Sequence, residues 1–173
     1  MRYFRLFEDP DNIRPQFSDW HTQMGVFRST EEIYGKLRWR KRLRVKFLKE
    51  LEFPALLCHP CFMFSAAAAD VLRMYSLSLR FKHIMLFDEE NGRAVPYQVP
   101  LLPERDCLGE GSVLSRDRSE VITGVLNGKK LGEDPVLRVA GVKGWCVIAD
   151  LEVTESLLRR VAEGIRIEEY VVR

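Results

Sequence analysis

The chain has 173 residues, of which 46% are apolar and 30% are charged, and its net charge at pH 7 is +2. This composition is typical of one globular domain of ordinary size and excludes an intrinsically disordered chain. The pI of about 8.4 lies below the range, above about 9, that is typical of dedicated nucleic-acid-binding domains. We expect a single domain over residues 1–173, with an irregular, basic part at 1–59 and an α+β core at 60–173.

The sequence also predicts where the protein resides. No apolar run approaches the roughly 20 residues that a membrane-spanning helix needs, and the N-terminal sequence MRYFRLFEDPDN lacks the apolar centre of a secretory signal. The four cysteines are therefore expected to be reduced thiols. We expect a cytoplasmic protein without membrane contact.

The first elements are predicted from apolar runs and the prolines that interrupt them. Residues 1–7 should form a strand, and residues 8–28 should form an extended excursion that Trp20 anchors. Ser29 or Thr30, followed by two glutamates, is typical of the start of a short helix.

The sequence LRWRKRLRVKF at residues 37–47 alternates apolar and basic side chains, and only Lys41 breaks the alternation. Because successive side chains of a strand point to opposite faces, an extended backbone here has one apolar and one cationic face. We predict a half-buried strand or hairpin arm, with Trp39 on the apolar face. The cationic side, called the basic face below, consists of Arg38, Arg40, Arg42, Arg44 and Lys46. Such a face fits an anionic partner, and it equally fits an edge strand whose cations prevent aggregation.

A helix over residues 66–77, capped by Ser65, should bury the face that carries Ala68, Val71, Leu72 and Tyr75. Residues 79–87 and 94–102 should then form a hairpin around an Asn-Gly turn. Since Pro96 and Pro100 donate no backbone hydrogen bond, we expect the second arm to be an edge strand or to break midway.

The C-terminal part is predicted to contain strands at 121–126, 135–139 and 145–151. Thr154 should cap a second helix over residues 155–163, which Gly164 ends, and residues 165–172 should form the last strand. The predicted fold class is α+β, a mostly antiparallel sheet with two main helices packed on it.

Cys58 and Cys61 form a C-x-x-C motif, which is found in thiol-redox and zinc sites. The predicted helix begins at Ser65, four residues after Cys61, which is too far for its N-terminus to activate a thiol. A zinc ion would need two more ligands, and the other candidates are scattered: Cys107, Cys146, His21 and His83. We expect no catalytic residue and no cofactor, and Cys58 and Cys61 stay the only metal candidates.

Four short segments resemble a family of bacterial immunity proteins: RYFRL at 2–6, PCFMFSAAAADVL at 60–72, PLLP at 100–103 and AEGI at 162–165. These are the Imm-type partners of polymorphic toxins, described as a domain of unknown function. The resemblance covers most of the chain, chiefly from residue 60 onward. It implies a small cytoplasmic protein that binds and neutralises a cognate toxin domain without catalysis, and Cys58 and Cys61 are not part of its pattern.

The leading hypothesis is that the basic face docks a protein toxin with an acidic surface. One alternative is a nucleic-acid-associated protein that uses residues 37–47, with Trp39 and Trp20 as stacking residues. The position of Trp39 among apolar residues counts against it. The other alternative is a thiol-redox or zinc protein that uses Cys58 and Cys61.

Overall fold

The computed structural model describes residues 1–47, 53–161 and 163–173. Residue 162, which belongs to the second predicted helix and to one of the segments that resemble immunity proteins, lies outside these ranges. The described elements are β1 (Tyr3–Glu8), α1 (Trp20–Met24), α2 (Thr30–Lys36), β2 (Arg40–Arg44), β3 (Leu56–Leu57), β4 (Met63–Ser65), α3 (Ala66–Tyr75), β5 (Phe81–Asp88), β6 (Arg93–Pro100), β7 (Glu104–Arg105), β8 (Val113–Leu114), β9 (Val121–Thr123), β10 (Val125–Leu126), α4 (Gly128–Leu131), β11 (Val136–Val139), β12 (Val147–Asp150), α5 (Leu151–Val161) and β13 (Ile165–Val172).

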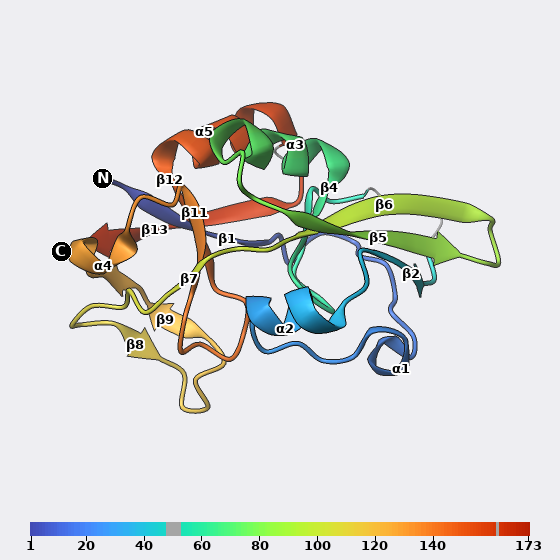
Figure 1. Ribbon diagram of the computed structural model, residues 1–173, viewed down its shortest axis with the longest axis horizontal. Coiled ribbons are helices and arrows are strands. Elements are labelled where there is room, and N and C mark those ends of the chain that lie inside the picture. The colour runs from blue at the N-terminus through green and yellow to red at the C-terminus, as the bar shows by residue number, and fades with distance from the viewer. Residues whose placement is uncertain (48–52, 162) are drawn as a thin grey trace.

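The described strands form three sheets, and Figure 1 shows the two larger ones extending to opposite ends of the molecule. The six-stranded sheet has the order β10-β13-β1-β12-β11-β7, the five-stranded sheet has the order β2-β5-β6-β4-β3, and β8 pairs with β9. Most pairs are antiparallel, and three are parallel: β10 with β13, β11 with β7 and β2 with β5. The α+β class with mostly antiparallel pairing is confirmed, but the strands are divided among several sheets.

The N-terminal part, predicted to be irregular over residues 1–59, contains regular structure. β1 lies inside the six-stranded sheet between β12 and β13, and the predicted excursion contains the short helix α1. Local sequence does not reveal this role, because both partners of β1 come from the C-terminal end of the chain.

Helices α3 and α5 contact each other and lie above the sheets in Figure 1. Ser65 caps α3 as predicted, since its Oγ accepts a hydrogen bond from the Ala68 N–H at 3.3 Å. Leu72 of α3 and Leu157 of α5 are buried in one core cluster that also contains strand residues of both large sheets. Within the described ranges, no helix combines the length and apolar character needed to span a membrane.

The start of α5 corrects the prediction that Thr154 caps this helix. The helix begins at Leu151, and the Asp150 carboxylate accepts a hydrogen bond from the Val153 N–H at 2.9 Å. Thr154 is buried one turn inside, where its hydroxyl donates to the Asp150 carbonyl at 2.6 Å. Asp150, at the end of β12, is therefore the residue that satisfies the first turn.

The predicted break at Pro96 and Pro100 is wrong, because β6 is continuous over Arg93–Pro100. The predicted edge position is corrected too, since β6 lies between β5 and β4, although β4 pairs with it only at Tyr97 and Gln98. The His83 N–H donates to the Trp39 carbonyl at 2.8 Å, so alternate residues of β5 turn their backbone groups toward β2. Pro96 and Pro100 pair with two of these residues, Met85 and Phe81, so their backbone nitrogens are directed away from β5, to the side of β6 on which β4 lies. Since β4 pairs only with Tyr97 and Gln98, neither proline has to donate a ladder hydrogen bond.

Candidate partner-binding surface

The basic strand of the sequence is β2, at the end of the five-stranded sheet (Figure 1). It pairs in parallel with β5, so it is a half-buried strand but no hairpin arm. Leu43, Val45 and Phe47 are buried in a cluster with Leu86 of β5 and Ile33 of α2. The predicted alternation therefore holds for residues 42–47, because an apolar core lies under one face of the strand.

The basic face is exposed on the opposite side. Arg40, Arg42 and Arg44 project from β2, Arg38 precedes the strand, and Lys46 follows it. Lys46 forms an exposed ion pair with Glu90, with 3.6 Å between Nζ and Oε2. Across the part of the chain that the structure describes, no ion pair involves any of the four arginines.

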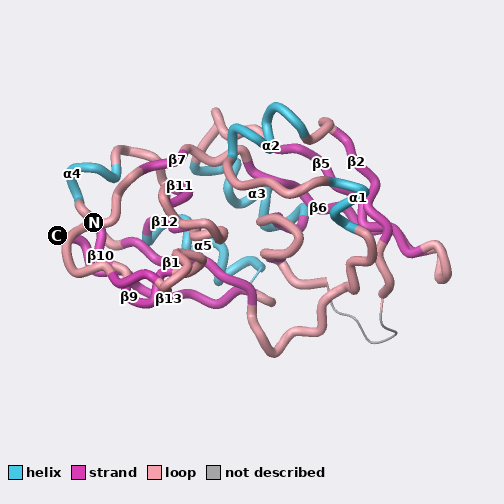
Figure 2. The backbone as a smooth tube through the Cα atoms, turned by 90° about the horizontal axis from the view of Figure 1, so that it is seen from below, coloured by secondary structure: helices cyan, strands magenta, loops and turns pink. Residues whose placement is uncertain are grey.

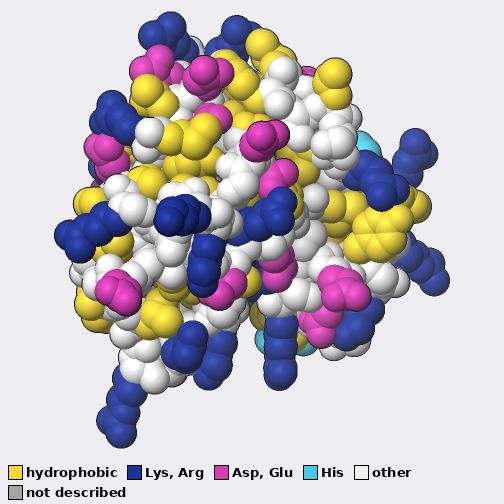
Figure 3. Space-filling model, turned by 60° about the vertical axis from the view of Figure 1, so that its left-hand side comes forward, with side chains coloured by type: hydrophobic (Ala, Val, Ile, Leu, Met, Phe, Trp, Pro, Cys, Tyr) yellow, Lys and Arg dark blue, Asp and Glu magenta, His cyan; other side chains and the backbone are white. Residues whose placement is uncertain are grey.

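Charges elsewhere on the molecule are mixed. Figure 3 shows the side of the molecule that bears the chain termini, where Lys and Arg side chains are interspersed with Asp and Glu. Arg2 pairs there with Glu169 at 2.7 Å, and Lys130 pairs with Asp106 at 3.3 Å. The basic face differs from this mixed surface because its arginines form no ion pair within the described residues, although Arg44 lines a pocket together with Asp19, Asp88, Glu89 and Glu90.

Trp39 departs from the predicted pattern, because 52% of its surface is exposed. It lies beyond the core cluster, where Lys82 of β5 approaches within 5.4 Å of its ring centre. Lys82 is buried, and its ammonium donates hydrogen bonds to the Tyr34 and Leu37 carbonyls at the end of α2. Burial lowers the pKa of Lys82, while these carbonyls favour its charged form. Lys82 thus ties the end of α2 to β5.

The second stacking candidate, Trp20, is partly buried. It packs against the cluster under β2, its ring centre lies 5.0 Å from that of His59 in an edge-on arrangement, and it is tilted against His21 at 3.6 Å. Figure 2 shows α1, which begins at Trp20, beside β2 at one end of the molecule. The residue anchors its segment as predicted.

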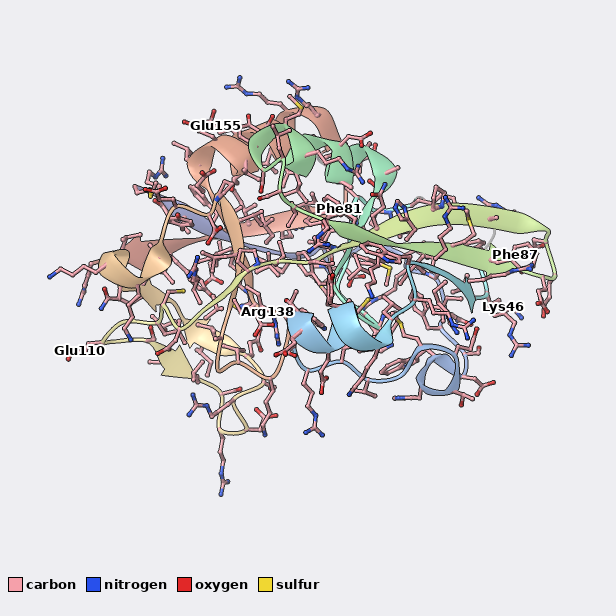
Figure 4. The ribbon with its side chains drawn as sticks, viewed as in Figure 1. Lys46, Phe81, Phe87, Glu110, Arg138 and Glu155 are labelled. Atoms are coloured by element: carbon pink, nitrogen blue, oxygen red, sulfur yellow. The ribbon has the colours of Figure 1, made fainter. Side chains whose placement is uncertain are left out.

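Next to the basic face, β5 and β6 contribute side chains that the sequence interpretation missed. His83, Met85 and Phe87 of β5 share the outer face with the β2 arginines, and Pro96 of β6 lies opposite Met85. Met85 is 40% exposed. The Arg42 guanidinium lies 3.5 Å from the centre of the Phe87 ring, a cation–π contact. Figure 4 shows Phe87 and Lys46 at the same end of the molecule.

These residues border a groove with a volume of about 530 Å³, lined by Arg40, Lys41, Arg42, His83, Ile84, Met85 and Pro96. The groove ends where α3 covers the sheet, since Arg73 of that helix lies 4.3 Å from the Phe81 ring centre and hydrogen-bonds Gln98. The part of this sheet face at Phe81 and Gln98 is thus covered by α3, and the part beside β2 has an apolar floor with a cationic border.

The C-x-x-C motif lies in the core. Cys61 is buried and Cys58 is partly buried, and both are free thiols. Desolvation by burial raises the pKa of Cys58 to about 12 and also raises the pKa of Cys61. As the sequence predicts, α3 begins only after Ser65, so its N-terminus does not reach the thiols. Among the described residues, no three His, Cys, Asp or Glu side chains form a group that could hold a metal ion.

An ion pair between the buried Arg138 and the partly exposed Glu104 connects β11 and β7 of the six-stranded sheet with α2. The Arg138 guanidinium of β11 donates to the Glu104 carboxylate at 2.6 Å, and Figure 4 shows Arg138 beside α2. Desolvation raises the pKa of Glu104, but hydrogen bonds from the Thr30 N–H and Arg138 outweigh it and hold the pKa below its ordinary value. Glu104 therefore fixes the first turn of α2, the helix under β2.

Comparisons with protein-family models, with curated proteins and with solved structures find no match for this chain. The functional interpretation therefore depends on the chemistry of the surface itself.

Proposed function

We propose that this chain is a non-enzymatic immunity protein that acts in the bacterial cytoplasm. Its basic face would bind an acidic surface of a cognate toxin domain and so neutralise the toxin. The complex would be stoichiometric, and it needs neither a metal nor a cofactor.

The observation that carries the proposal is the set of four exposed arginines that form no ion pair within the described residues, next to the exposed apolar floor of Met85 and Pro96. Arginine is enriched in the centres of protein interfaces, since its planar group hydrogen-bonds carboxylates and packs on apolar surface. A cationic border also accelerates the encounter with an acidic partner, in a manner that salt screens.

The alternative of nucleic-acid binding draws support from the exposure of Trp39. Single-strand binders stack bases on aromatic rings beside a basic groove. Here, however, the Trp39 side chain lies on the inner side of the sheet, near Lys82. Arg40 and Arg42 lie on the outer face. Bases on Trp39 and phosphates on these arginines would occupy opposite faces of one sheet, so we favour the protein partner.

A growth assay tests the proposal. A bacterial host expresses the toxin candidate encoded beside this chain's gene, with the wild-type chain or with the R40Q/R42Q/R44Q variant. We expect the wild type to restore growth and the variant to restore much less at equal soluble expression. Failure of the wild type to protect, or a gene without a toxin-coding neighbour, would contradict the proposal. Purified wild type that binds RNA or DNA at moderate salt would favour the alternative.

A further inference from the structure

The edge of β2 has a backbone orientation that the hydrogen bonds define. The Val45 N–H donates to the Phe87 carbonyl at 3.0 Å, and the Trp39 carbonyl accepts from His83 at 2.8 Å. The odd-numbered residues from Trp39 to Val45 therefore turn their backbone groups toward β5. The N–H and C=O groups of Arg40 and Arg42 point the other way, out of the sheet.

Part of this edge is already occupied by the chain itself. Lys46 and Gln16 exchange two backbone hydrogen bonds of 2.9 Å, and the Arg44 N–H donates to the Gln23 side-chain oxygen at 2.8 Å. Within residues 1–47, 53–161 and 163–173, no hydrogen bond reaches the backbone groups of Arg40 and Arg42. The edge is thus covered beyond Arg44 and open before it.

We propose that the partner adds a short extended segment to this open edge, as a strand next to β2, with acidic side chains at alternate positions. This inference rests on the proposed function and specifies how the basic face is recognised. Strand addition supplies main-chain hydrogen bonds, and alternate side chains supply specificity.

The charge of the edge selects this partner. On an added strand, every second side chain would lie on the outer face beside Arg40 and Arg42, about 5 Å away between Cβ atoms. Carboxylates at these positions would pair with the guanidinium groups. A second copy of this chain would instead place its own arginines against them, which like-charge repulsion disfavours. The observations therefore favour an acidic strand over an edge-to-edge dimer.

The test uses the native protein and a blocked heptapeptide in which Glu alternates with Thr, measured by isothermal titration at low salt. Two further peptides carry N-methyl groups, either on all Glu amides or on all Thr amides. Only one set of amides faces β2, so we expect methylation of that set to weaken binding about tenfold or more and the other set to matter much less. A peptide with Lys in place of Glu should not bind.

Equal affinities of the two methylated peptides would show that charge alone holds the peptide, and absence of binding by the Glu peptide would also overturn the inference. Neither result affects the growth assay, so failure of strand addition is distinguishable from failure of the proposed function. Two variants provide an independent check: R42Q keeps the outward N–H and R42P removes it. Both must be folded by circular dichroism, and equal binding by the two would contradict the inference.

Discussion

The R40Q/R42Q/R44Q variant should leave the fold almost as stable as the wild type. Arg40 and Arg44 are exposed and form no ion pair within the described residues, so each change should alter the free energy of unfolding by about 0.5 kcal/mol or less. Arg42 additionally loses its contact with the Phe87 ring, worth about 0.5–1 kcal/mol at an exposed site. Relief of repulsion among the three cations acts in the opposite direction. We expect a net loss of about 1 kcal/mol or less.

Urea unfolding followed by tryptophan fluorescence measures this difference, with Leu43→Ala as the matched control on the same strand. Leu43 is fully buried, so its truncation should cost about 2–5 kcal/mol. A loss of roughly 3 kcal/mol or more in the triple variant would be typical of a broken buried ion pair. That result would show that the arginines hold the fold together and would refute their assignment to a free surface.

Three further predictions concern the rest of the molecule. R138M should lower the free energy of unfolding by about 1–3 kcal/mol, because it removes the buried guanidinium that hydrogen-bonds the partly exposed Glu104 carboxylate; R138M/E104Q should recover part of the loss in the same urea titration. G124A should cost about 1–3 kcal/mol, since an added Cβ would lie 2.4 Å from the Tyr170 ring, and calorimetry that shows an unchanged melting temperature would contradict this packing. Burial raises the pKa of Cys58 from 9.0 to about 12, so its contribution to stability is present below pH 9 and is lost as the pH rises toward 12. C58A should show a smaller loss of stability between pH 8 and pH 10 than wild type, on the order of one thiol's ionisation, and equal slopes would refute it.

Much of the strand pattern could be predicted, because period-two alternation depends only on one buried face. The exposed cations and buried Leu43, Val45 and Phe47 confirm this for residues 42–47. Trp39 follows the same alternation yet is exposed, since the core ends before it and Lys82 occupies the space beneath. Local periodicity cannot show where a core ends.

The missed features depend on contacts between distant segments. The parallel pairing of β2 with β5 decides which side chains surround the basic face. Because β5 carries apolar residues on both of its faces, its sequence alone does not show that Met85 is exposed. The start of α5 was predicted wrongly because the sequence contains two residues that are favoured as helix caps, Asp150 and Thr154. The structure shows that Asp150 caps the helix and that Thr154 lies inside it. The choice between these two residues depends on where β12 ends, because α5 begins directly after that strand.

The most direct test is the association rate constant between this chain and the toxin encoded beside its gene, measured for wild type and R40Q/R42Q/R44Q at low and high salt. If the basic face docks an acidic surface, the variant associates more slowly at low salt, and the difference shrinks as salt screens the charges. Equal rates at both salt concentrations, together with equal protection of the host, would show that the toxin binds elsewhere.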